Sequence, residues 1–215
     1  MKILAVETCL GACSVALLRE GEILAHRFEA MERGHAEALA PMVAEAMQGF
    51  AFSSLSRLAV TTGPGTFTGQ RVGLAFMRGL RLALEIPLIG VTTLEAMTAA
   101  AMAETGTYKA AAIHDARRDE AYLLLQDGET VTLAPVVLPF REAVERIASF
   151  GACTLSGTGA AAASAILGTA FPLSTMRAPD ALWVARLARH RPVPDRVPGP
   201  LYLRPPDAKL PAPTP

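Results

Sequence analysis

Charge is scarce in this sequence, and neither sign dominates. Charged residues make up 19% of the 215 residues, and 20 Lys and Arg side chains are balanced by 20 Asp and Glu. A chain without net positive charge lacks the attraction that dominates binding to nucleic acid. We therefore predict that this chain is not the main surface for an RNA partner. Hydrophobic residues reach 51%, which favours burial of extra apolar surface against another protein.

Cysteines and long apolar runs are also in short supply. The sequence has three cysteines, and Cys9 and Cys13 lack the C-x-x-C spacing of zinc or redox sites. No apolar run approaches the roughly 18 residues of a membrane span, and Glu7 interrupts the apolar N-terminal stretch. We expect a reduced, cytoplasmic protein with no membrane segment or signal peptide, whose cysteines are small core residues.

The spacing of apolar residues predicts an α/β protein whose two halves repeat one outline. Short apolar runs between turn residues indicate strands, and runs with helical spacing indicate helices. In the first half we predict three antiparallel strands, then alternating helices and strands, at residues 2–7, 13–19, 23–30, 35–49, 55–62, 68–85, 87–91 and 92–104. In the second half we predict three strands, a helix, a strand, an alanine-rich helix and a last helix, at residues 109–114, 120–126, 129–138, 141–149 and 152–156, after Gly159, and at 181–190.

This repetition predicts mixed sheets in two duplicated halves, the second of which is reduced. We place an N-terminal α/β subdomain at residues 1–106 and a smaller one at residues 107–200. Residues 201–215 are rich in proline, so we expect an extended tail there rather than packed elements.

The segment GPGTFTGQRVG, from Gly63 to Gly73, lies between a predicted strand and a predicted helix. It is not a P-loop, because the lysine and the required glycine spacing are missing. It is not a G-x-G-x-x-G fingerprint either, because its third glycine comes one residue late. We interpret it as a tight turn in which Thr66 or Thr68 caps the next helix. Direct binding of phosphate at the helix terminus is the alternative.

Small residues recur every four positions in the two helices on either side of this turn. Such rows let a second helix approach closely, so they predict a surface for a copy of the chain or a partner. The alternative is that they pack on their own sheet. The rows are Ala36, Ala40 and Ala44, then Gly69 and Gly73, then Ala75, Gly79 and Ala83. The candidate interface comprises His35, Ala36, Leu39, Ala40, Val43, Ala44, Met47, Thr68, Gly69, Val72, Gly73, Phe76, Gly79 and Leu80.

Several motifs, in order along the chain, resemble those of the TsaB (YeaZ) family. GPGTFTGQRVG is similar to the family signature GPGSFTGLRIG, and ILAVETCLGACSVALL is similar to the family's opening strands. RGHAEALAPMV resembles its HSE-x-LLP helix start, and DARRDEAYLLL resembles its DAR-[RK]-x-E-V-Y element. PLYLRPPDAKLP is similar to its C-terminal P-x-YLR-x-P segment. The resemblance therefore spans nearly the whole chain.

The resemblance implies an actin-like, Hsp70-like (ASKHA) fold and a non-catalytic scaffold subunit. It implies a heterodimer with the catalytic subunit TsaD, which TsaE joins, and which installs threonylcarbamoyl on the tRNA adenosine next to the anticodon. It also implies a homodimer through the two helices described above, and only indirect contact with tRNA. The assembled complex uses ATP and magnesium, so the chain needs no cofactor of its own. An independent actin-like ATPase or small-molecule kinase is the alternative.

A remnant of a nucleotide cleft is the other feature that the resemblance implies. It would lie at Glu7, Thr8, Gly157 and Gly159 and bind nucleotide weakly. Glu7 is one methylene longer than the usual aspartate, which disfavours accurate placement of magnesium. The four histidines are isolated in the sequence, so we predict no metal site, and we find no catalytic or protease motif.

A charged cluster, Asp115, Arg117, Arg118 and Glu120, follows a predicted strand. We interpret it as a solvated hairpin with internal ion pairs, which contribute little to stability. The alternative is that Arg117 or Arg118 contacts TsaE, nucleotide or tRNA phosphate.

Overall fold

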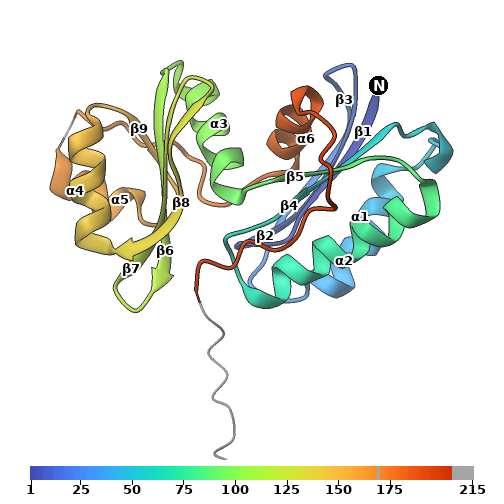
Figure 1. The fold of residues 1–215 in the computed structure, drawn as a ribbon, viewed down its shortest axis with the longest axis horizontal. Coiled ribbons are helices and arrows are strands. Elements are labelled where there is room, and N and C mark those ends of the chain that lie inside the picture. Colours follow the sequence, from blue (N-terminus) through green and yellow to red (C-terminus); the bar gives the residue numbers. More distant parts are fainter. Residues whose placement is uncertain (169, 205–215) are drawn as a thin grey trace, which may run out of the picture.

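A five-stranded mixed sheet forms the centre of the first lobe of the protein (Figure 1). The computed structural model describes residues 1–168 and 170–204. The sheet has the order β3-β2-β1-β4-β5, in which β1 pairs antiparallel with β2 and parallel with β4. Its strands are β1 (Lys2–Glu7), β2 (Ala12–Arg19), β3 (Glu22–Ala30), β4 (Arg57–Thr61) and β5 (Leu88–Val91).

Helices cover both faces of this sheet, because β1 and β2 are buried on both sides. On one face, α1 (His35–Ala46) and α2 (Phe67–Leu84) pack against a core that includes Leu4 and Val6. On the opposite face, α6 (Ala181–His190) packs against a second core. A short 3₁₀ helix, η1 (Phe52–Ser54), connects α1 to β4.

The second lobe repeats this plan with four strands in the order β8-β7-β6-β9. Figure 1 shows α4 and α5 on one face of its sheet and α3 on the other. The elements are α3 (Thr93–Thr105), β6 (Lys109–Arg117), β7 (Glu120–Asp127), β8 (Thr130–Pro139), α4 (Phe140–Phe150), β9 (Thr154–Ser156) and α5 (Ala160–Leu167).

The two sheets confirm the predicted duplication. In both, three antiparallel strands are followed by a helix and then by a strand that pairs parallel with the first of the three, which is β1 or β6. Only the outermost parallel strand differs: β5 pairs with β4 in the first lobe. In the second lobe its place is taken by an isolated parallel bridge from Leu155 to Leu173. The second half is therefore the reduced copy, as predicted.

The predicted boundary between subdomains, at residue 106, does not match the packing. Helix α3 precedes that boundary but packs on β6, β7 and β9 of the second sheet. Helix α6 follows it but packs on β1, β2, β4 and β5 of the first sheet. The two helices contact each other between the lobes, so each half supplies one helix to the middle of the molecule. The reason is tertiary: α3 packs on the sheet that begins directly after it, and α6 packs on a sheet distant in sequence.

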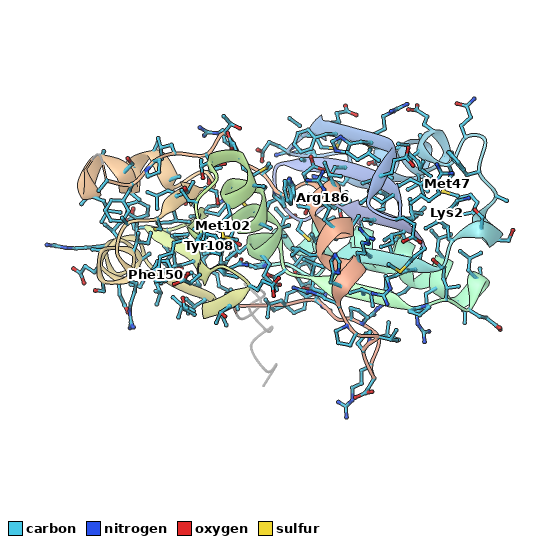
Figure 2. All side chains as sticks on the ribbon, turned by 90° about the horizontal axis from the view of Figure 1, so that it is seen from above. Lys2, Met47, Met102, Tyr108, Phe150 and Arg186 are labelled. Carbon is cyan, nitrogen blue, oxygen red and sulfur yellow. The ribbon has the colours of Figure 1, made fainter. Side chains whose placement is uncertain are left out.

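Side chains fill both lobes when they are seen from above (Figure 2). Lys2 and Met47 lie in the first lobe, and Tyr108 and Phe150 lie in the second. None of the helices within residues 1–168 and 170–204 combines the length and apolar character needed to cross a membrane. Part of the predicted tail, residues 201–204, forms neither helix nor strand, whereas residues 205–215 lie outside the described residues.

Candidate functional site

The glycine-rich turn closes directly on the turn between β1 and β2. The backbone N–H of Thr66 donates to the carbonyl oxygen of Cys9 at 2.8 Å. A Cβ atom on Gly65 would collide with that same carbonyl group, and one on Gly69 would collide with the carbonyl oxygen of Thr8. The glycines are thus required because two backbone segments touch, as glycine permits. Thr66 caps α2 by accepting from Gly69 N at 3.1 Å, which confirms one of the two predicted caps.

Thr8 ties the first strand to α2 through its buried side chain. Its hydroxyl donates to the carbonyl oxygen of Gly69 at 2.7 Å and accepts from the N–H of Gly73 at 3.1 Å. A Cβ atom on Gly73 would lie 2.6 Å from the same hydroxyl oxygen. Both hydrogen-bonding functions of Thr8 are therefore used inside the protein.

Glu7 lies at the end of β1 with its side chain fully buried. Its Oε1 accepts from the N–H of Cys9 at 2.5 Å and from the Thr61 hydroxyl at 3.3 Å. Its Oε2 has no hydrogen-bond partner among the described residues. Burial raises the pKa of this carboxyl from 4.5 to about 8, because a charge is poorly solvated there. A neutral carboxylic acid therefore occupies this position of the predicted nucleotide-cleft remnant.

Gly157 and Gly159 occupy the corresponding turn of the second lobe. A Cβ atom on Gly157 would collide with the carbonyl oxygen of Ile113, and Gly159 N donates to that oxygen at 3.1 Å. Both glycines are buried. The four residues of the predicted nucleotide cleft are therefore buried and serve packing within the lobes. Weak binding of nucleotide by the chain stays a prediction.

The candidate interface divides into buried and exposed residues. Six of its members are buried: His35, Leu39, Val43, Met47, Gly69 and Gly73. They lie inside the first lobe in this single chain, so their part in the interface stays a prediction. His35 lies at the start of α1 with its Nε2 buried and without a partner in the described residues. Val72, Phe76 and Leu80 are half-buried against the same core.

The remaining members are exposed and lie on two adjacent helices. We call this surface the α1/α2 outer face. Leu82, which is 77% exposed, was missed in the sequence, although it follows Gly79 by three residues on the same helix. A Cβ atom on Gly79 would meet nothing within 4 Å. The face comprises Ala36, Ala40, Ala44, Thr68, Ala75, Gly79, Leu82 and Ala83.

The charged cluster forms the turn between β6 and β7. Its backbone is left-handed at three successive residues, Arg117, Arg118 and Asp119. Asp115 accepts from the N–H of Arg117 at 2.7 Å. The carboxylate of Glu120 pairs with Arg204, which the sequence prediction did not include. The predicted hairpin is confirmed, but the ion pair of Glu120 joins the hairpin to the C-terminal segment instead of to the cluster itself.

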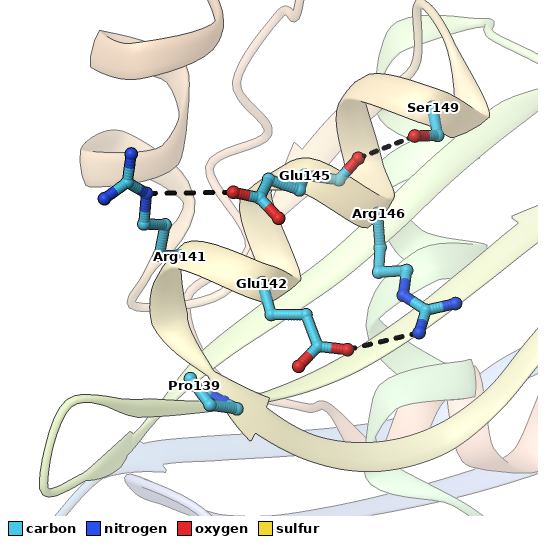
Figure 3. A pocket seen from close by; sticks show the side chains of 6 residues that line it. All are labelled: Pro139, Arg141, Glu142, Glu145, Arg146 and Ser149. Carbon is cyan, nitrogen blue, oxygen red and sulfur yellow. Dashed lines mark hydrogen bonds and ion pairs between the residues drawn. The ribbon is translucent and has the colours of Figure 1, made fainter.

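A shallow depression on the outside of α4 is lined by charged side chains that pair along the helix (Figure 3). Arg146 lies 3.1 Å from Glu142, and Arg141 lies 3.7 Å from Glu145. This depression is remote in sequence from the glycine turn and offers no unpaired acid or base. Over the described part of the chain, no group of three His, Cys, Asp or Glu side chains could hold a metal ion.

Comparison with known proteins then identifies the family. The family model described as TsaD, tRNA N6-adenosine threonylcarbamoyltransferase, matches residues 22–174. YeaZ from Pseudomonas aeruginosa is 31% identical, with a TM-score of 0.79 over 94% of this chain and 99% of that one. The chain belongs to the TsaB/YeaZ family. The predicted family resemblance is thereby confirmed.

A curated TsaB/YeaZ relative supports the same assignment over a shorter stretch. The tRNA threonylcarbamoyladenosine biosynthesis protein TsaB of Escherichia coli is 41% identical over 124 residues. The match covers 57% of this chain and 53% of the E. coli protein, so the chain spans about half the length of that relative. The protein EutJ of Carboxydothermus hydrogenoformans is 14% identical with a TM-score of 0.50. That likeness concerns the fold alone, and it agrees with the predicted actin-like α/β fold.

Proposed function

We propose that this TsaB/YeaZ chain is a non-catalytic subunit that supports threonylcarbamoylation of tRNA at the adenosine next to the anticodon. It docks on TsaD, TsaE joins that complex, and the assembled complex uses ATP and magnesium. Two comparisons support this proposal: the name of the E. coli relative and the match to the family model described as TsaD. The chain contacts tRNA only through the complex.

The observation that carries the proposal is the exposed row of small residues on the α1/α2 outer face. Ala40 and Gly79 leave the helix surfaces low, so helices of a second protein can approach closely. Such a low apolar face gives no benefit to an isolated helix in water, because glycine in a helix interior destabilises it by roughly 1 kcal/mol relative to alanine. We propose that this face binds TsaD and, in its absence, a second copy of the chain.

The burial of Glu7 supports a non-catalytic role over an independent ATPase or kinase. A phosphoryl-transfer site needs groups that stabilise charge on the phosphates and the metal. Glu7 is neutral and buried, and the hydroxyl of Thr8 is hydrogen-bonded to α2. Titration calorimetry of the isolated chain with magnesium and ATP tests this. Micromolar binding together with steady hydrolysis would overturn the non-catalytic role.

The docking proposal is tested by Gly79→Leu in a reconstituted modification reaction with TsaD and TsaE. A leucine at this position has open space, so the variant should fold, yet it raises the surface where a partner helix would lie. We expect co-purification with TsaD to weaken by about tenfold or more, roughly 1.4 kcal/mol or more, and modification to fall with it.

Ala162→Leu is the matched control, because Ala162 is exposed on α5 of the second lobe. We expect it to behave as the unchanged chain does. If Gly79→Leu binds TsaD as tightly as this control, the α1/α2 outer face is not the docking surface. Sedimentation of each variant alone shows whether self-association uses the same face.

A further inference from the structure

The segment from Arg191 to Arg204 leaves α6 and runs along the first lobe toward the second (Figure 1). Arg78 of α2 donates from Nη2 to the carbonyl oxygen of Pro198 at 2.6 Å. Pro198 lies directly against Gly90, where a Cβ atom would come within 2.9 Å of the proline ring. The segment is thus held along the flank of α2 and the edge strand β5.

The end of this segment is anchored on the first lobe by a backbone hydrogen bond and an aromatic stack. Leu201 N donates to the carbonyl oxygen of Thr62 at 2.7 Å. The ring of Tyr202 stacks on Phe67 of α2, with centroids 5.6 Å apart and an interplanar angle of 27°. Arg71 donates from Nε to the Tyr202 hydroxyl at 3.0 Å, and its guanidinium lies 3.4 Å from the centre of the Phe67 ring.

Two residues later the same segment binds the second lobe. Arg204 pairs with the carboxylate of Glu120 and donates to the carbonyl oxygen of Arg117 at 3.2 Å. The two acceptors flank the left-handed turn, since Arg117 ends β6 and Glu120 begins β7. Four consecutive residues, Leu201 to Arg204, therefore connect α2 to the hairpin of the opposite lobe.

The chain itself crosses between the lobes at two other places. Thr92 joins β5 of the first lobe to α3, which packs on the second sheet. The second crossing lies near Ala178. Before it, Met176 is bonded to Gly157 of the second lobe, and after it, Asp180 caps α6 on the first lobe. Two such crossings are the places where a change of angle between lobes would be absorbed.

We infer that residues Leu201–Arg204 form a latch that fixes the angle between the two lobes. Its two ends differ in chemistry. The end on α2 is aromatic and backbone-bonded, whereas the end on the second lobe consists of charge-assisted contacts near the surface. Salt screens surface ion pairs, so the latch releases first at Arg204 and stays attached at Tyr202. The device does not depend on the proposed function, because it lies within one chain.

Distances between two spin labels on the full chain test this latch. Ser53→Cys in the first lobe and Ser149→Cys in the second provide exposed labelling sites, and the three native cysteines are buried. We expect one narrow distance distribution in low salt. Arg204→Ala should broaden this distance distribution at least twofold. Addition of 1 M salt should broaden the distribution of the unchanged chain but should not broaden that of Arg204→Ala any further.

Three further variants make the result decisive. Arg196→Ala removes an exposed arginine from the same segment and should leave the narrow distribution intact. Arg204→Glu or Glu120→Arg alone should broaden the distance distribution. The two changes together exchange the charges of the pair and should make the distribution narrow again. Tyr202→Ala should broaden the distribution at both salt concentrations. If Arg204→Ala and Tyr202→Ala both give the distribution of Arg196→Ala at low salt, no latch exists.

Discussion

The two lobes share a strand order but differ in how the end of the central strand is used. In the first lobe, Thr8 and Cys9 touch the long glycine turn, and the buried Glu7 next to them is neutral. In the second lobe, a shorter glycine turn packs on Ile113, and His114 follows it with only 8% exposure. The two copies of the fold therefore bury different titratable groups near this point, a carboxylic acid in the first lobe and an imidazole in the second.

The outer helices differ as well. The α1/α2 outer face consists of small and apolar residues beside exposed charged ones such as Glu45 and Arg78, whereas α4 exposes Arg and Glu side chains that pair along the helix. Since a charged helix face is well solvated and a row of small apolar residues is not, the contrast agrees with the proposal that a protein partner binds the first lobe.

The largest expected effect comes from filling the glycine turns. Gly69→Ala places a methyl group against the backbone of Thr8, which cannot shift without moving β1. We expect a loss of about 3 kcal/mol or more in the free energy of unfolding. Gly159→Ala in the second lobe meets Ile113 at 3.2 Å and should lose about 1 kcal/mol. Chemical denaturation measures both.

Gly79→Ala is the control for these two variants, because it adds the same methyl group in open space on α2. It should raise stability by roughly 0.5–1 kcal/mol. Equal losses at Gly69 and Gly159 would show that the two glycine turns are packed alike, against the comparison made above.

The second prediction concerns Glu7 and the alkaline side of the stability curve. Its folded pKa of about 8 exceeds the ordinary value of 4.5, so the folded state keeps a proton that the unfolded chain releases. The contribution of Glu7 to the free energy of unfolding should therefore be greatest below pH 4.5. It should fall by up to about 1.4 kcal/mol per pH unit as the pH rises toward 8. Glu7→Gln mimics the neutral acid and should remove this decline.

Thermal unfolding of Glu7→Gln and the unchanged chain between pH 5 and pH 8 provides the measurement. We expect the two curves to diverge as the pH rises, with the variant more stable at pH 8. Parallel curves over this window would mean that Glu7 is ionised in the folded protein.

The third prediction is the mirror image in the second lobe. Burial lowers the pKa of His114 from 6.5 to about 4, because the protonated ring is poorly solvated. The unfolded chain takes up a proton between these values and the folded protein does not. Stability should therefore be lost as the pH falls from 6.5 to 4, and His114→Gln should be less sensitive over that window. A variant as acid-sensitive as the unchanged chain would exclude His114 as a source of this loss.

The sequence predicted the positions of the helices and strands better than it predicted which elements pack against one another. The bounds of α6, Ala181–His190, agree with the prediction, because an amphipathic run there follows Asp180, whose side chain caps the helix. Its sheet could not be predicted, since an apolar face indicates burial without naming the surface that covers it. For the small-residue rows, Gly69 and Gly73 pack inside the first lobe, whereas Gly79 is exposed, and a partner at Gly79 stays a prediction.

The smallest expected effect lies on the outside of α4. Arg146 and Glu142 are spaced i, i+4 and are 57% and 41% exposed, and such pairs contribute about 0.3–0.5 kcal/mol. Arg146→Ala should lower the free energy of unfolding by no more than this amount, and less in high salt. It should also leave co-purification with TsaD unchanged, in contrast to Gly79→Leu. Pull-down of both variants alongside denaturation separates the two lobes: if Arg146→Ala weakens the complex as much as Gly79→Leu does, the second lobe also carries a docking surface, and the assignment of partner binding to the first lobe alone is wrong.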